Sequence, residues 1–168
     1  MLNKLKTKKF WLTLLRDISI LIVIFYAITL YQTRNTPAIA PELKGTLISG
    51  ELINLSDMVK KSPVLVYFWG SWCPICKVSS PIITDLSADY QVISIALSSG
   101  ENQEVLNYLN ENNYNFPVLN DPDGIVSHLW SVSATPMVYI IDRDGKVDSV
   151  TMGAASAIGL KFRLWLAS

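Results

Sequence analysis

Residues that build metal centres and disulfide frameworks are scarce in this sequence of 168 residues, which has two cysteines and a single histidine, His128. Because Cys73 and Cys76, two residues apart, are the only cysteines, one chain can form neither a separate structural disulfide nor a four-cysteine zinc site. Net charge is also absent, since fourteen basic and fourteen acidic side chains cancel. Such a chain lacks the broad field that gathers nucleic acid. We therefore expect no metal, no cofactor and no nucleic-acid partner, and favour protein or small neutral substrates.

Charged residues are missing from residues 18–31, and a shorter apolar stretch at 10–15 precedes them. At a rise of about 1.5 Å per residue, residues 10–31 reach roughly 33 Å, enough to cross a hydrocarbon core if Arg16 extends toward the interface. Basic residues are more numerous before this stretch than after it, so the positive-inside bias places residues 1–9 in the cytoplasm. The sequence thus predicts one N-terminal transmembrane helix over 10–31, with the rest of the chain exported.

A cleaved secretory signal is the alternative for this leader. Ala38, Ile39 and Ala40 resemble a small-residue cleavage site, and an apolar run of about fourteen residues suits the core of a signal peptide. Cleavage after Ala40 would leave Pro41 first in the mature chain, and the fixed φ of proline fits an extended protease site poorly. We therefore favour a retained anchor. Under either interpretation, the remaining chain lies in a compartment that permits disulfides.

The residues after the leader divide into a linker at 32–43, which holds two prolines, and a domain at 44–168. We expect the domain to open with a hairpin around Gly50 and a brief helix capped by Ser56. Strands are expected at 64–69, 92–97, 116–119, 137–141 and 147–152, and helices at 74–88, 101–112, 125–130 and 154–166. This alternation predicts an α/β sandwich around a central mixed sheet.

The chemistry is expected at Cys73-Pro74-Ile75-Cys76, where the buried strand at 64–69 gives way to a helix N-terminus. Unpaired amides and the helix dipole at such a point stabilise a thiolate, so we predict that Cys73 is the exposed, low-pKa thiol. Cys76 would be the buried partner that attacks a mixed disulfide formed at Cys73, and Pro74 would stiffen the turn. A metal-binding motif would need a second cysteine pair or suitably spaced histidines, so the pattern favours redox chemistry.

Two motifs carry a resemblance to known proteins. Residues 63–77, PVLVYFWGSWCPICK, resemble the active-site strand and helix of thioredoxin-like proteins, and residues 134–139, ATPMVY, resemble their cis-proline loop. With the hairpin and the anchor, the chain is most similar to the TlpA/DsbE-like branch, and within it to membrane-anchored bacterial protein disulfide oxidoreductases of the suppressor-for-copper-sensitivity protein D (ScsD) type. The resemblance implies a thioredoxin-like fold, a periplasmic domain on the inner membrane and a link to copper or oxidative-stress tolerance.

The resemblance also implies a substrate-binding surface. Pro136 would be cis and face the first cysteine, although base rates alone favour a trans bond, and Thr135 would offer backbone groups to an extended substrate segment. Trp72, next to the nucleophile, is expected to form an exposed wall of this surface, together with Pro74 and Ile75 of the motif. The expected partners are exported protein thiols and disulfides and a membrane protein that donates or accepts electrons. We expect the chain to act as a monomer.

Two acids of related families are missing from this sequence. Thioredoxins carry a buried acid in the strand before the cysteines, where Tyr67 stands here, and cytochrome-maturation relatives carry a glutamate where Ser79 stands. Such an acid would help to deprotonate the resolving thiol. We therefore rank reduction of apocytochrome c below general disulfide exchange.

Two further functions compete with disulfide exchange. Soft thiolates suit Cu(I), and Met58, Met137, Met152 and His128 could add ligands to a metallochaperone. The spacing argues against this, since none of these four residues lies in the cysteine motif and methionine commonly fills apolar cores. A peroxidase would require an open, polar pocket at the position that Trp72 occupies, so this alternative is disfavoured. The sequence therefore predicts a protein-disulfide oxidoreductase.

Overall fold

The computed structural model describes residues 8–33 and 36–168, which belong to two separate units. The first unit contains a single described helix, α1 (Lys8–Thr33). The second unit, Thr36–Ser168, holds the remaining elements. α1 includes residues 10–31, the stretch predicted to cross the membrane. Within the described residues, no helix combines the length and apolar character that a membrane crossing requires, so the predicted transmembrane helix is not confirmed.

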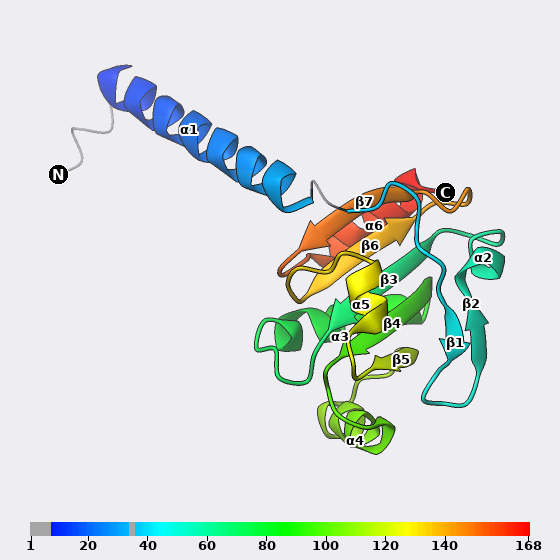
Figure 1. Ribbon diagram of the computed structural model, residues 1–168. Coiled ribbons are helices and arrows are strands. Elements are labelled where there is room, and N and C mark those ends of the chain that lie inside the picture. The colour runs from blue at the N-terminus through cyan, green and yellow to red at the C-terminus, as the bar shows by residue number, and fades with distance from the viewer. Residues whose placement is uncertain (1–7, 34–35) are drawn as a thin grey trace. The chain divides into compact units, whose positions relative to one another are not determined.

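A five-stranded mixed sheet forms the centre of the second unit, in the order β5-β4-β3-β6-β7 (Figure 1). Its strands are β3 (Val64–Trp69), β4 (Gln91–Leu97), β5 (Val118–Asp121), β6 (Met137–Ile141) and β7 (Val147–Met152). β3 pairs with β4 in parallel and with β6 in antiparallel orientation. All six residues of β3 are buried, as the continuous apolar run predicted. The expected mixed sheet with a doubly covered central strand is confirmed.

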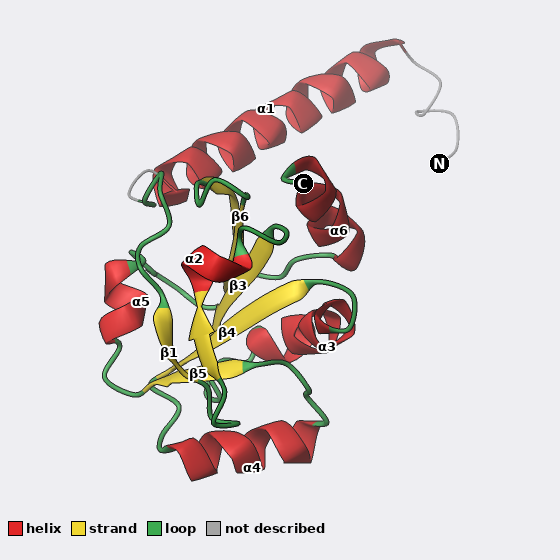
Figure 2. Cartoon of the chain, turned by 90° about the vertical axis from the view of Figure 1, so that its right-hand side faces the viewer, coloured by secondary structure: helices red, strands yellow, loops and turns green. Residues whose placement is uncertain are grey.

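One face of the sheet is covered by three helices. They are α3 (Cys76–Ser87), α4 (Asn102–Asn112) and α6 (Ala157–Leu166). Leu65, Tyr67 and Trp69 of β3 point to this face and join buried side chains of the three helices in a first core. Figure 2 shows α3 and α6 on one side of the sheet and α5 on the other. Because successive strand residues face opposite sides, the remaining β3 residues are free to build a second core.

The second core lies on the opposite face. Val64, Val66 and Phe68 of β3 pack there with side chains from smaller elements and the loops beside them. These elements are β1 (Lys44–Thr46), β2 (Leu52–Asn54), α2 (Leu55–Met58) and α5 (Ile125–Leu129). The predicted α/β sandwich is therefore confirmed, with one core on each side of the sheet.

The two predicted hairpins are confirmed. β1 and β2 pair antiparallel as a separate two-stranded sheet, and Gly50 between them adopts a left-handed conformation with a φ of 89°. In the turn between β6 and β7, Gly145 has a φ of 78° and donates its N–H to the carbonyl of Asp142. Both turns thus use a glycine where a side chain would be strained.

Two helix-capping residues were misassigned or missed, and the predicted start of one of these helices is wrong for that reason. α2 is capped by the side chain of Asn54, which accepts the N–H of Ser56 at 3.0 Å, so Ser56 is not the cap. α6 begins three residues later than predicted, because Ser156 caps it by accepting the N–H of Gly159 at 3.1 Å. Polar residues at neighbouring positions compete for the cap, and the sequence alone does not distinguish them.

Residues 38–43, which fall in the stretch predicted as a linker, make contacts with the domain. Ala40 donates its N–H to the carbonyl of Gly145 at 2.9 Å. Leu43 is 2% exposed and belongs to the second core. The compact unit accordingly begins at Thr36.

We expect a fragment of residues 36–168 to fold without α1, and a fragment of residues 44–168 to be clearly less stable. The shorter fragment loses Leu43 and the backbone bonds of residues 38–40, and loss of one buried leucine side chain costs about 2–5 kcal/mol. Urea unfolding followed by circular dichroism measures both free energies. Equal stability of the two fragments would show that residues 36–43 contribute nothing to the domain.

Candidate active site

The central strand leads directly into the cysteine motif. After β3 the chain enters a loop, in which Cys73 donates its N–H to the carbonyl of Gly70 at 3.1 Å. Pro74 and Ile75 lie in a turn, so α3 begins at Cys76, two residues later than predicted. Cys73 and Cys76 form a disulfide with their Cα atoms 5.3 Å apart, a separation typical of such bridges.

The N-terminus of α3 is directed at the first cysteine. The N–H of Cys76 donates to Cys73 Sγ at 3.2 Å. A helix N-terminal amide in this position stabilises negative charge on sulfur. Cys73 is 3% exposed and Cys76 is fully buried. Cys73 is thus more enclosed than the sequence predicted, but it is the more exposed of the two cysteines.

The loop before β6 faces the cysteines. The Thr135–Pro136 bond is cis, as the resemblance implied. The carbonyl oxygen of Thr135 lies 3.5 Å from Cys73 Sγ. Pro136 is buried, and its own carbonyl accepts the N–H of Gly153 at 2.8 Å. The structure therefore brings Thr135 next to Cys73, while the Pro136 carbonyl is already engaged with the domain.

An apolar rim surrounds the motif. Trp72 is 57% exposed and Ile75 is 51% exposed, and Pro74 between them is exposed as well. These three residues are neighbours of Cys73 in the sequence, and their side chains carry no charge. A substrate that approaches Cys73 would bury apolar surface on this rim.

Sequence reasoning missed the residues that hold the rim in place. The indole Nε1–H of Trp72 donates to the carbonyl of Leu97 at 3.1 Å, and the N–H of Ser71 donates to Ser99 Oγ at 2.9 Å. The ring of Trp72 also lies against Gly70, where an added Cβ would be 2.6 Å from the indole. The sequence signal was only a Ser-Ser-Gly stretch after a buried strand, which is typical of any loop.

Hydroxyl groups occupy the region behind the disulfide. The hydroxyl of Tyr67 shares a hydrogen bond with Ser80 Oγ at 3.1 Å and donates to the carbonyl of Cys76 at 3.5 Å. Burial raises the pKa of Tyr67. Ser79, the other position where a related family carries an acid, is 2% exposed. The polar groups at these positions are therefore neutral at physiological pH.

We expect stability to fall above about pH 10, the pKa of tyrosine in an unfolded chain, because Tyr67 ionises in the unfolded state before it does so in the folded state. Burial also raises the pKa of Tyr139, whose hydroxyl donates to the carbonyl of Trp130 at 2.6 Å. The raised pKa of Tyr67 alone steepens the loss by up to about 1.4 kcal/mol per pH unit. Urea unfolding at pH 9 and pH 11 should therefore show a smaller loss for Tyr67→Phe than for the natural protein, and an identical loss would contradict this expectation.

The additional Cu(I) ligands considered above lie apart from the cysteines. Met137 is fully buried in the second core, and Met58 and Met152 pack against the same core. The cysteines belong to the first core, on the other face of the sheet. His128 is exposed on α5. Within residues 8–33 and 36–168, no group of three or more His, Cys, Asp or Glu side chains could hold a metal ion.

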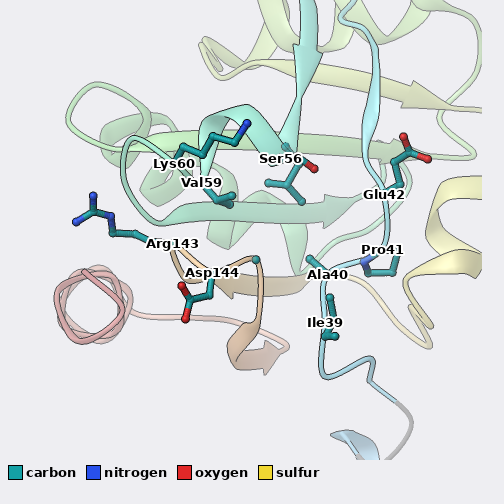
Figure 3. A pocket seen from close by; sticks show the side chains of 11 residues that line it. Ile39, Ala40, Pro41, Glu42, Ser56, Val59, Lys60, Arg143 and Asp144 are labelled. Carbon is teal, nitrogen blue, oxygen red and sulfur yellow. The ribbon is translucent and has the colours of Figure 1, made fainter.

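A hollow of about 310 Å³ lies at the end of the sheet that is opposite to the cysteines (Figure 3). At this end Val64 pairs with Ile141, whereas Phe68 pairs with Met137 at the end that carries the cysteine loop. The lining comes from residues 39–42, from α2 and the two residues after it, and from the turn between β6 and β7. The hollow is therefore separate from the disulfide.

Comparison with known proteins identifies a family and several similar proteins. The AhpC/TSA family profile matches residues 36–150. A thioredoxin-like protein of Haemophilus influenzae is 40% identical over 121 residues, which are 71% of this chain and 72% of that protein. The thiol-disulfide oxidoreductase ResA of Oceanobacillus iheyensis is 31% identical over 124 residues, which are 68% of this chain and 64% of that protein. The chain thus spans slightly less than two thirds of the length of this second relative.

A solved structure has the same fold as this chain. The crystal structure of a protein assigned as thiol:disulfide interchange protein DsbE from Chlorobium tepidum has a TM-score of 0.69 and 28% sequence identity. The comparison covers 79% of this chain and 97% of that one. The predicted thioredoxin-like fold is confirmed.

Proposed function

The chain belongs to the AhpC/TSA family and is a thiol–disulfide oxidoreductase, and we propose that it exchanges disulfides with exported proteins through Cys73 and Cys76. One observation carries the proposal: the Cys76 amide at the start of α3 donates to Cys73 Sγ at 3.2 Å. This arrangement favours a thiolate on Cys73, and the thiolate is the form that attacks a disulfide.

The proposed reaction has two steps. In the reducing direction, the Cys73 thiolate attacks one sulfur of a substrate disulfide and displaces the other, which takes a proton from solvent. Cys76 then loses its proton, attacks Cys73 Sγ and displaces the second substrate sulfur. Two electrons pass from the Cys73–Cys76 dithiol to the substrate, and the enzyme is left with its disulfide. The oxidising direction is the reverse of these steps.

We assign substrate binding to the residues around Cys73. Trp72, Pro74 and Ile75 offer exposed apolar surface. The Thr135 segment, whose carbonyl oxygen lies 3.5 Å from Cys73 Sγ, offers backbone groups to an extended segment of substrate. Such a segment could pair with the backbone before β6 and place its own sulfur at Cys73.

The location is also a proposal: residues 10–31 anchor the enzyme to a bacterial inner membrane, with the domain in the periplasm. Its support is the excess of basic residues before the apolar stretch. There the enzyme would act as a monomer and exchange electrons with a membrane protein, and it would be linked to copper or oxidative-stress tolerance. Resistance of the full chain to carbonate extraction, with the domain cleaved only by protease added from the periplasmic side, would support this location. Recovery in the soluble cytoplasmic fraction would overturn it.

The activity is tested by whether the purified full chain accelerates the reduction of insulin by dithiothreitol. We expect at least about a tenfold acceleration over dithiothreitol alone, because a positioned thiolate reacts faster than a free thiol. A chain that binds Cu(I) tightly but leaves the reduction of insulin unchanged would instead support the metallochaperone alternative.

A further inference from the structure

A loop far from the cysteines in the sequence supports the active-site loop. Residues 98–101 connect β4 to α4, and Ser99 within them is only 7% exposed. A polar side chain that is this deeply buried usually has a hydrogen-bonding role. Its partners identify that role.

The hydroxyl of Ser99 makes one hydrogen bond to the active-site loop and one to the last residue of β4. It accepts the N–H of Ser71 at 2.9 Å and donates to the carbonyl of Leu97 at 3.1 Å. The same Leu97 carbonyl accepts the indole Nε1–H of Trp72 at 3.1 Å. We call the Ser99 hydroxyl and the Leu97 carbonyl the latch. The latch binds the backbone before Trp72 and the side chain of Trp72 at the same time.

Two further features show that this arrangement is specified by the fold. Ser98 has a φ of 45°, a left-handed conformation that is uncommon for a residue other than glycine, and it persists only where the surroundings impose it. Gly70 has no side chain, and a Cβ there would overlap the Trp72 indole. The indole thus lies against Gly70 and is hydrogen-bonded to the Leu97 carbonyl of the latch.

We propose that Ser99 is a positioning residue, which fixes Trp72 through the latch as a rigid wall of the substrate surface beside Cys73. This inference rests on the proposed function. A wall that is ordered before binding loses little conformational entropy when a protein substrate covers it, so the latch should act mainly on substrate binding. Serine is suited to the role because one hydroxyl both donates and accepts, which alanine cannot do.

The test compares three variants of the full chain, Ser99→Ala, Ser99→Thr and Ser98→Ala. Ser98 is the matched control, since its hydroxyl donates to the carbonyl of Pro122 at 3.3 Å and not to the active-site loop. For Ser99→Ala we expect the KM for insulin to rise about five-fold, a typical effect of one lost hydrogen bond, with kcat changed less than two-fold. The KM of Ser99→Thr should be close to that of the natural protein, and the KM of Ser98→Ala should equal it.

A second readout is independent of activity. Exchange of the Trp72 indole N–H with solvent, followed by nuclear magnetic resonance on the full chain in detergent, should be several-fold faster in Ser99→Ala than in the natural protein and Ser98→Ala. If Ser99→Ala does not fold, Trp72→Phe removes the indole N–H that donates to the Leu97 carbonyl of the latch, and it should raise the KM as well. Unchanged KM and unchanged indole exchange in Ser99→Ala would overturn the proposal, as would a normal KM in Trp72→Phe. Failure of the proposed function is distinct, because the natural protein itself would then be inactive on insulin.

Discussion

Replacing Cys73 by serine is expected to reduce disulfide exchange to the uncatalysed rate, a loss of at least about a hundredfold. A serine hydroxyl does not form the thiolate that attacks the substrate, and no other sulfur of the site reaches solvent, since Cys76 is fully buried. The rate of insulin reduction with the full chain measures this loss.

Cys76→Ser should fail in a different way. Cys73 can still attack, so one equivalent of substrate thiol is released per enzyme, and turnover then stops because the mixed disulfide is not resolved. Ser87→Ala, at the last residue of α3, is the control for general damage to the helix and should turn over normally. Substantial multiple turnover by Cys73→Ser would mean that the attacking sulfur has been misassigned.

Phe68→Ala is expected to destabilise the domain by about 3–5 kcal/mol. Phe68 is fully buried at the centre of the second core, with ring centroids 5.5 Å from Trp130 and 5.6 Å from Tyr139. Its removal leaves a cavity on the central strand that the packed neighbours cannot fill. Urea unfolding of the two full-length proteins would measure the change.

Phe162→Ala provides a matched control on the surface. Phe162 is 57% exposed on α6 and stacks on Trp165 with centroids 5.9 Å apart. Its loss should cost less than about 1 kcal/mol, because exposed apolar contacts contribute little. Similar losses for the two phenylalanines would show that the burial pattern of β3 does not determine the stability of the domain.

The sheet was predictable because its pattern is unambiguous. The apolar run of β3 and the Asp-Gly turn between β6 and β7 each have one physical interpretation, and the structure has both at the expected residues. The cysteine motif was predictable for the same reason, since its residues are adjacent in the sequence. The cis bond at Pro136 came from the resemblance alone, because base rates favour trans.

The latch could not have been predicted in the same way. Ser99 and Ser71 are 28 residues apart and meet only because β3 and β4 are parallel neighbours whose ends lie together. The start of α3 was also missed. Pro74 is compatible with either the first turn of a helix or the turn before it, so the sequence does not decide between them.

The central claim is that Cys73 attacks exported proteins and Cys76 resolves the adduct, and non-reducing gels of the exported fraction test it most directly. In cells that express Cys76→Ala, mixed disulfides with exported proteins should accumulate through Cys73, because only slower external thiols can resolve them. Cells that express Cys73→Ala should accumulate none. Equal amounts of adduct in the two variants, or none in either while both lose Cu(I) binding, would contradict the account.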